Sequence, residues 1–341
     1  MRIAQLVSNY HSIPSGSNGA MCQVVDQLTG GLVERGHDVT LFASGDSVTS
    51  AKLVAVTEVK TSDLGLSDTL ISNYNHALAA NCYEKAPEFD IIHSHFSVVS
   101  AFYAKLVETP TVQTVHLPIS DNLRTILGHY RDLNFVSFSL SQRRQMPDLN
   151  WIANIYHGVD TELFAYNDSP KDYFLFVGPL TEQGAPHLAI EAAQAAGVKL
   201  IIAGRSDTND NYWHEIIEPT IDDQRVQFVG YVANHAKVEL LREAKAILFP
   251  AQWDEPFGLA LTEALSCGTP VIGFSRGMVP EIVQDGDTGF IVRDVSQMTA
   301  AIGSIHRINR SACRDRAEKL FSHHKMVDGY EHVYQRIVAK N

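Results

Sequence analysis

The sequence has few cysteines, no long apolar run and no excess of positive charge. The four cysteines, Cys22, Cys82, Cys267 and Cys313, are far apart and form no CxxC pair, so we expect buried reduced thiols and no disulfide framework. No apolar run approaches the roughly 18 residues that a membrane-spanning helix needs. The amino-terminal residues reach a polar Ser-Asn pair before a signal-peptide core could form. We therefore expect a first β-strand at this end and a cytoplasmic protein.

The charge balance is negative in both halves of the chain. The formal net charge is -12, from 27 Lys and Arg against 39 Asp and Glu. Residues 1–155 carry 10 basic and 14 acidic side chains, and the rest of the chain carries 17 and 25. Nucleic acids and anionic membranes bind basic surfaces, so this balance disfavours both as partners. The length of 341 residues is enough for two globular domains.

Short β-rich runs alternate with helical patterns along the chain, which is typical of parallel βα units. The expected strands are residues 3–7, 39–43, 91–93, 111–115, 135–138, 151–155, 173–177, 200–203, 226–229, 246–249, 271–274 and 290–292. The expected helices are one after the glycine-rich loop 11–19 and then residues 68–84, 97–107, 119–131, 186–196, 234–243, 258–266, 296–308 and 323–338. This pattern predicts an α/β protein with domains at residues 1–160 and 161–341, although the apolar stripe of the final helix assigns it to neither domain.

The most informative segment is a strand, loop and helix at residues 249–273. Glu255 precedes a helix that starts near Gly258, and Glu263 lies within its first two turns. A helix start offers unpaired N–H groups and partial positive charge to a phosphate. Each carboxylate can accept paired hydrogen bonds from vicinal hydroxyls. The alternative is that Glu255 only favours the helix dipole while Glu263 is solvated.

This segment resembles the signature of glycosyltransferase family 4, in which seven residues separate two glutamates, and residues 277–292 resemble a second stretch of that family. The family consists of retaining transferases with the GT-B fold, so the resemblance implies two Rossmann-like domains with the donor in an interdomain cleft. It also implies that Glu255 contacts the donor sugar and that Glu263 binds the nucleotide ribose.

Weaker matches to the family follow in order along the chain. The loop that ends at Gly19 resembles a glycine-rich loop near donor and acceptor, with a plain turn as the alternative. His116, at the end of a strand, matches the histidine beside the transferred sugar, with a structural histidine as the alternative. His157 begins an element that resembles the family's domain junction. His93 and His95 share a strand face but lack a third ligand, and the fold requires no metal. We therefore expect no metal and no cofactor.

One region departs from the family pattern. The family carries Gly-Arg after the first strand of the second domain and then a lysine before a glycine, and both cations hold the donor diphosphate. Here Gly178 is kept, but Pro179 stands at the arginine position and Gly184 at the lysine position. Charge-assisted hydrogen bonds contribute about 1.5–3 kcal/mol each, so their loss weakens diphosphate binding. Arg205, after the next strand, is the candidate replacement, with a surface arginine as the alternative.

The sequence thus predicts a retaining transferase that moves a hexose from a nucleotide-sugar to an acceptor. UDP-glucose is chosen on family frequency alone, and we expect a soluble acceptor rather than a membrane lipid. The residues expected to act in catalysis are His116 and Glu255, and those expected to bind the donor are Gly19, Gly178, Arg205, Phe257, Gly258, Leu259 and Glu263. Two alternatives stay open, namely a nucleotide-sugar epimerase of the same fold and a catalytically degenerate nucleotide- or sugar-binding member.

Overall fold

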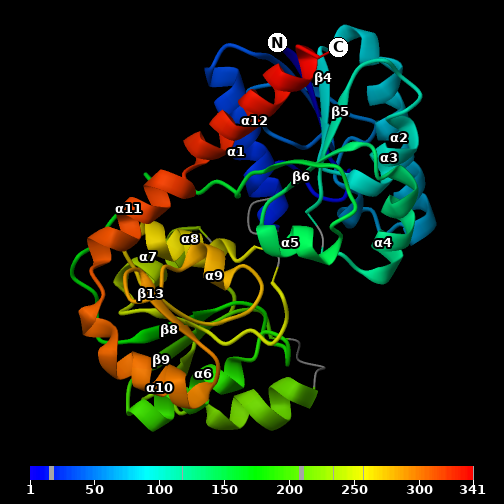
Figure 1. The fold of residues 1–341 in the computed structure, drawn as a ribbon. Helices are drawn as coiled ribbons and strands as arrows, with labels where there is room; N and C mark the ends of the chain where they lie inside the picture. The colour runs from blue at the N-terminus through cyan, green and yellow to red at the C-terminus, as the bar shows by residue number, and fades with distance from the viewer. Residues whose placement is uncertain (15–18, 117, 207–210, 233, 256, 341) are drawn as a thin grey trace. The chain divides into compact units, whose positions relative to one another are not determined.

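The structure is a computed structural model that describes residues 1–14, 19–116, 118–206, 211–232, 234–255 and 257–340. The chain divides into two compact units, drawn in Figure 1. Unit 1 combines residues Met1–Gly158 with the segment that begins at His323, and unit 2 is Val159–Ser322. The sequence-based division placed the boundary after residue 160 and left the domain of the final helix open, whereas the structure places that helix in unit 1. Within the described chain, no helix has both the length and the apolar character needed to span a bilayer.

Unit 1 is built on a seven-stranded parallel sheet of order β3-β2-β1-β4-β5-β6-β7. Its strands are β1 (Arg2–Leu6), β2 (Asp38–Phe42), β3 (Lys52–Val54), β4 (Ile91–Ser94), β5 (Thr111–Thr114), β6 (Asn134–Ser137) and β7 (Trp151–Asn154). Its α-helices are α1 (Ala20–Glu34), α2 (Asp68–Glu84), α3 (Ser97–Tyr103), α4 (Asp121–Leu127), α5 (Leu140–Gln145) and α12 (His323–Val338). Single 3₁₀ turns η1 (Thr61–Asp63), η2 (Ala86–Glu88) and η3 (Gly128–Tyr130) complete the unit. The strand order reverses between β1 and β4, which makes their carboxyl ends the switch point of the sheet.

Unit 2 repeats this plan with a six-stranded parallel sheet of order β10-β9-β8-β11-β12-β13. Its strands are β8 (Phe174–Val177), β9 (Leu200–Ala203), β10 (Val226–Phe228), β11 (Ile247–Phe249), β12 (Val271–Phe274) and β13 (Gly289–Val292). Its helices are α6 (Pro186–Ala196), η4 (Trp213–Ile217), η5 (Glu218–Thr220), α7 (Asn234–Glu243), α8 (Leu259–Ser266), α9 (Val279–Ile282), α10 (Val295–Ser304), η6 (Ile305–Arg307) and α11 (Arg310–Leu320). The switch point here lies between β8 and β11. The two sheets confirm the predicted α/β class with two Rossmann-like domains.

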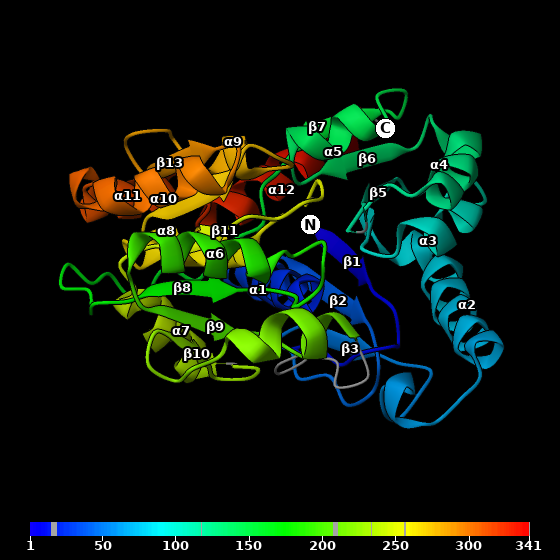
Figure 2. The same ribbon diagram turned by 90° about the horizontal axis from the view of Figure 1, so that it is seen from below.

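The two faces of each sheet are covered by helices because alternate strand residues point in opposite directions. In unit 1, Leu41 packs in the cluster beneath α1, while its neighbour Phe42 packs in the cluster beneath α2. In unit 2, α6 and α10 cover one face, where Phe176 and Leu248 belong to a single apolar core. Figure 2 shows α6 beside β8 and β9 on that face.

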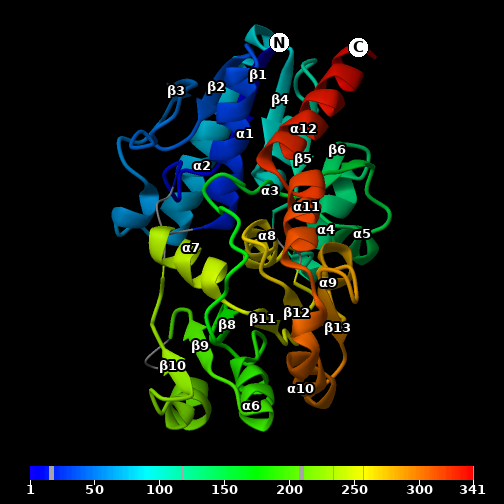
Figure 3. The ribbon, with the colours of Figure 1, turned by 90° about the vertical axis from the view of Figure 1, so that its left-hand side faces the viewer.

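The final helix α12 is an integral part of unit 1 and lies beside α1 in Figures 1 and 3. A Cβ atom at Gly31 of α1 would lie 2.6 Å from a methyl group of Val327, so the two helices meet closely. Arg35 pairs with Asp328 at 2.6 Å and with Glu331 at 2.7 Å. The buried Tyr330 and Tyr334 of this helix bond to residues of β5 and β4, so its apolar stripe covers the first sheet, which the sequence alone did not indicate.

Several short elements were not predicted. The three residues of β3 are too few for a strand period to show. The six residues of α5 are likewise too few to show a helical period. Helix α11 has so few apolar residues that its pattern does not stand out from a polar surface segment.

Docking of α12 can be tested by removing a large buried ring. Tyr330 is fully buried, so Tyr330→Ala should leave a cavity and lower the free energy of unfolding of unit 1 by about 3–5 kcal/mol. Gln335 is exposed on the same helix, and Gln335→Ala is the matched control with little expected change. Urea denaturation measures both variants, and equal stability of the two would contradict the docking of α12 on unit 1.

Candidate functional site

The carboxyl ends of β8 and β9 bring Gly178 and Arg205 into adjacent loops. The N–H of Gly178 donates to the carbonyl of Ala203 at 3.2 Å. A Cβ atom at Gly204 would lie 2.3 Å from the carbonyl oxygen of Gly178, so only glycine permits this contact. Arg205 follows directly, and its guanidinium carbon lies 4.3 Å from the centre of the Tyr231 ring. The stacking holds this cation at the carboxyl edge. Tyr231 was missed by the sequence analysis.

The loop at Gly184 is packed closely against its own main chain. A Cβ atom there would lie 2.1 Å from the carbonyl oxygen of Pro179, so no lysine fits at this position while the loop keeps its shape. The preceding residue, Gln183, accepts a hydrogen bond from the N–H of Gln252 at 2.8 Å. This bond joins the loop after β8 to the loop after β11, on the two sides of the switch point.

Glu255 lies in the loop between β11 and α8, and a second loop supports its main chain. Gly277 has a φ of 53°, and a Cβ atom there would lie 2.6 Å from the carbonyl oxygen of Glu255. That carbonyl accepts the N–H of Met278 at 3.3 Å. Burial raises the pKa of the Glu255 carboxyl to about 7, while a hydrogen bond from the backbone of Phe257 opposes that rise. A carboxyl with a raised pKa beside a sheet switch point is typical of a functional site.

The backbone N–H groups at the start of α8 only partly match the expected phosphate site. The N–H of Phe257 is directed to the Glu255 carboxylate, and the N–H of Gly258 donates to the sulfur of Met278 at 2.8 Å. Two of the three expected donors thus have acceptors inside the protein. Leu259 begins the helix, and the N–H groups of a first turn have no acceptor within the helix.

Glu263 is buried and carries an unsatisfied oxygen. Its side chain is only 2% exposed, and Oε1 accepts a hydrogen bond from Nζ of Lys237 at 2.7 Å. Its other oxygen, Oε2, has no hydrogen-bond partner in the described structure. A buried carboxylate oxygen without a donor costs free energy, so this atom is a candidate acceptor for a ligand hydroxyl. The structure excludes the alternative of a solvated Glu263. Lys237 on α7 was missed because nothing in the sequence links it to the motif.

Four histidines gather at the carboxyl ends of β4, β5 and β7 in unit 1. The rings of His93 and His95 are 4.0 Å apart, which confirms that they share a strand face. Nδ1 of His95 lies 2.9 Å from Nε2 of His116, whose ring stacks on that of His157 at 5.2 Å. Burial lowers the pKa of His116 to about 3 and lowers those of the other three well below the usual value, with smaller effects from neighbouring histidines. The cluster is therefore neutral at physiological pH.

The predicted residue Gly19 lies at the start of α1. Gly19 has a φ of 104° directly before α1, a conformation that favours glycine, while residues 15–18 of the same loop lie outside the described residues.

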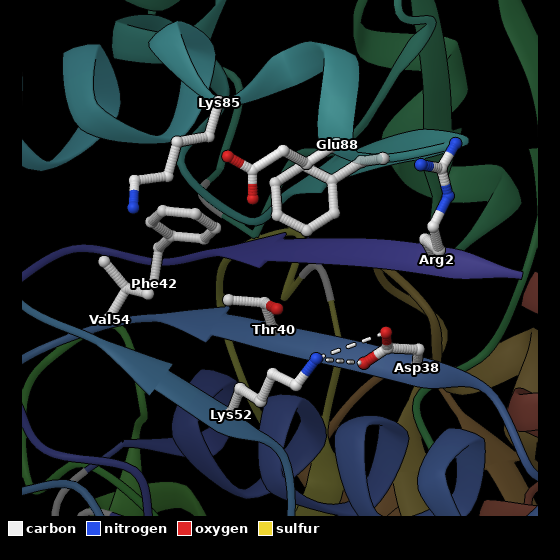
Figure 4. A pocket seen from close by; sticks show the side chains of 9 residues that line it. Arg2, Asp38, Thr40, Phe42, Lys52, Val54, Lys85 and Glu88 are labelled. Carbon is white, nitrogen blue, oxygen red and sulfur yellow. Dashed lines mark hydrogen bonds and ion pairs between the residues drawn. The ribbon is translucent and has the colours of Figure 1, made fainter.

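No three His, Cys, Asp or Glu side chains of the described chain are placed to hold a metal ion. Figure 4 shows a pocket in unit 1 where Lys52 pairs with Asp38 at 3.0 Å. It contains none of the predicted site residues.

Two family models match the chain, one in each half. The model described as "Glycosyltransferase Family 4" matches residues 22–163, and the model described as "Glycosyl transferases group 1" matches residues 161–319. Among curated proteins, the chain is similar to N-acetyl-alpha-D-glucosaminyl L-malate synthase of Bacillus anthracis, with 24% identity over 90% of this chain and 91% of that protein. It is also 27% identical to D-inositol 3-phosphate glycosyltransferase of Mycobacterium marinum, over 54% of this chain and 43% of that protein.

Solved structures show the same fold at low identity. Sucrose-phosphate synthase from Thermosynechococcus elongatus superposes with a TM-score of 0.77 at 18% identity, covering 100% of both chains. Anabaena HepE in complex with UDP and glucose gives a TM-score of 0.73 at 18% identity, covering 98% of this chain and 100% of that one. These likenesses confirm the GT-B fold.

The raised pKa of Glu255 predicts a pH-dependent stability. The folded carboxyl keeps its proton up to about pH 7, whereas the ordinary pKa of a glutamic acid is 4.5. The folded state therefore binds more protons between these values and becomes less stable as the pH rises. Glu255→Gln removes this loss and should be more stable than wild type by about 1–3 kcal/mol at pH 8, with little gain at pH 4.5. Denaturation at the two pH values measures the difference. Glu215→Gln, at an exposed carboxylate of unit 2, is the control, and a pH-independent effect of Glu255→Gln would contradict the prediction.

Proposed function

This chain belongs to the glycosyltransferases of the GT-B fold, and from that membership we propose a retaining enzyme that transfers a hexose from a nucleotide-sugar to a soluble acceptor. UDP-glucose is the first donor to test, supported by a structural neighbour solved with UDP and glucose. A relative named for L-malate supports a small soluble acceptor. The transfer needs no divalent metal in this proposal, because helix-end N–H groups and a cation hold the phosphates.

The observation that carries the proposal is the unsatisfied Oε2 of the buried Glu263. Vicinal ribose hydroxyls would donate to this oxygen and remove the cost of leaving it unpaired. Because the carboxylate is 2% exposed, the ribose reaches it only when a covering side chain moves. Lys237 is the candidate, since its ammonium group contacts the other oxygen of the carboxylate and keeps 19% exposure.

The remaining groups have separate roles in the proposed transfer. The Glu255 carboxyl, on a main chain that Gly277 supports, hydrogen-bonds to hydroxyls of the donor sugar. Arg205 stabilises the charge that develops on the leaving diphosphate, which is electrostatic stabilisation and not nucleophilic catalysis. A leaving phosphate oxygen takes the acceptor proton. His116 is neutral and supports the sugar through a hydrogen bond.

Nucleotide binding tests the assignment of Glu263. Glu263→Gln should raise the dissociation constant for UDP at least tenfold, because a hydrogen bond to a charged acceptor contributes about 1.5–3 kcal/mol. Isothermal titration calorimetry measures this, with Glu239→Gln on the exposed face of α7 as the control. Adding EDTA should leave the affinity of wild type unchanged. Unchanged UDP affinity in folded Glu263→Gln contradicts the ribose assignment, and loss of affinity in EDTA contradicts metal independence.

The role of Arg205 can be separated from that of the base and ribose. Arg205→Ala should weaken UDP binding by about 1.5–3 kcal/mol and uridine binding much less, because uridine lacks the diphosphate. Tyr231→Ala should weaken UDP binding in the same direction, since the ring positions the guanidinium. Arg225→Ala, exposed before the amino end of β10, is the control. Equal UDP affinity of wild type and Arg205→Ala would show that backbone N–H groups hold the diphosphate without this cation.

Turnover distinguishes transfer from its rivals. A transferase releases UDP only when an acceptor is present, whereas an epimerase converts UDP-glucose without one, and a degenerate member binds UDP with no turnover.

A further inference from the structure

We propose that the side-chain amide of Gln5 fixes the tautomer of His116 through His95, so that His116 presents an unprotonated Nδ1. Gln5 is a polar residue in the middle of an apolar strand, and it is fully buried. On β1 it pairs in register with His93 of β4. Its neighbours Ala4 and Leu6 pack in the cluster beneath α2, so Gln5 faces the opposite side of the sheet, toward α12.

The first chain of hydrogen bonds runs from Gln5 to His116. Oε1 of Gln5 lies 2.6 Å from Nε2 of His95, and an amide oxygen can only accept, so Nε2 of His95 carries the proton. His95 is neutral, which leaves its Nδ1 as an acceptor. That atom lies 2.9 Å from Nε2 of His116, so Nε2 of His116 must donate. The neutral His116 ring is then unprotonated at Nδ1.

A second chain holds the other end of the same amide. Nε2 of Gln5 donates to the hydroxyl of Tyr334 at 3.2 Å, and that hydroxyl lies 2.5 Å from Nδ1 of His93. The His93 ring continues to Thr114 at 2.8 Å, and Thr114 reaches the hydroxyl of Tyr330 at 2.8 Å. Both tyrosines come from α12. The amide is therefore bonded at its oxygen and at its nitrogen.

The orientation of the Gln5 amide decides the proton positions along both chains of hydrogen bonds. If the amide were reversed, its nitrogen would face Nε2 of His95, which would then have to accept. His95 would donate from Nδ1, and His116 would accept at Nε2 and carry its proton at Nδ1. Because each neutral imidazole has one donor and one acceptor, no intermediate arrangement satisfies the chain. Gln5 thus sets whether His116 offers a donor or an acceptor at Nδ1.

The surroundings keep the histidine rings neutral, so the possible states of each ring differ in which nitrogen carries the proton and not in charge. Among the described residues, the titratable groups facing His95 and His116 are His93 from β4 and His157 after β7, while the two tyrosines of α12 contact His93. Burial lowers the pKa of every histidine in the group. Among the described residues, no hydrogen bond to Nδ1 of His116 is present. An acceptor at this atom fits a sugar hydroxyl, which can donate to it. This step rests on the proposed function.

The wild-type protein gives the first test. Nitrogen-15 NMR of histidine-labelled protein at pH 7 distinguishes protonated from unprotonated ring nitrogens, with signals assigned by comparison with His116→Ala and His95→Ala. We expect Nε2 of both rings to be protonated and Nδ1 of both to be unprotonated. A proton on Nδ1 of His116 overturns the proposal, whether or not the protein transfers sugar.

Gln5→Met provides the second test at nearly constant volume. The thioether offers no strong acceptor to Nε2–H of His95, so the wild-type tautomer loses the bond that selects it, and His116 should become protonated at Nδ1 in a measurable fraction of molecules. Tyr334→Phe is the control, because it breaks the second chain and keeps the bond between Gln5 and His95. It should lower stability yet leave the His116 signals as in wild type.

Kinetics add a readout that depends on the proposed function. Gln5→Met should lower kcat for sugar transfer at least tenfold while UDP affinity changes less than twofold, because the nucleotide site lies on unit 2. A Gln5→Met protein that keeps the wild-type His116 signals overturns the proposal, and so does a Tyr334→Phe protein in which those signals reverse. Absence of turnover in wild type with the expected NMR spectrum refutes the proposed function alone.

Discussion

Direct contact between main chains of neighbouring loops is the constraint on which the candidate site of unit 2 depends. Gly204 lies against the carbonyl of Gly178, Gly184 against that of Pro179, and Gly277 against that of Glu255. Each contact leaves no room for a Cβ atom: the first joins the loops after β8 and β9, the second lies within the loop after β8, and the third joins the loops after β11 and β12. The hydrogen bond from Gln252 to Gln183 connects the two pairs of loops. Protein interiors transmit such displacements because they are close-packed. A Cβ atom added at Gly277 would displace the main chain of Glu255, and one added at Gly204 would displace the backbone just before Arg205.

The two glutamates of the motif differ in their surroundings, because Glu255 has a raised pKa while Glu263 keeps an ion pair. Burial raises the pKa of the Glu255 carboxyl, and one N–H from Phe257 opposes that rise only in part. Glu263 lies deeper but has Lys237 at 2.7 Å. Breaking a buried pair by removing one partner costs about 3–5 kcal/mol, so Lys237 matters to stability as well as to nucleotide entry. The two glutamates of one motif thus face different electrostatic conditions.

Much of the fold could be predicted from the sequence because it depends on local patterns. Apolar runs and helical periods located most strands and helices, and α2, α6 and α12 have the predicted bounds. The docking of α12 could not be predicted, since its apolar stripe fits any apolar surface and Tyr330 finds Thr114 only in three dimensions. Motif spacing identified Glu255 and Glu263 as candidates, but the partners Lys237, Met278 and Tyr231 come from distant segments. Gln5 did leave a signal, because a polar residue inside an apolar strand requires a buried partner.

The return of α12 to unit 1 has a consequence for the order in which the protein can mature during synthesis. Unit 2 is an insertion in the chain of unit 1, so the ribosome completes it before the last helix emerges. Until then the nascent first unit lacks the two tyrosine hydroxyls that bond to His93 and Thr114. The histidine cluster therefore acquires its full set of partners only after unit 2 has been made. A chain that ends before α12 cannot complete the histidine cluster.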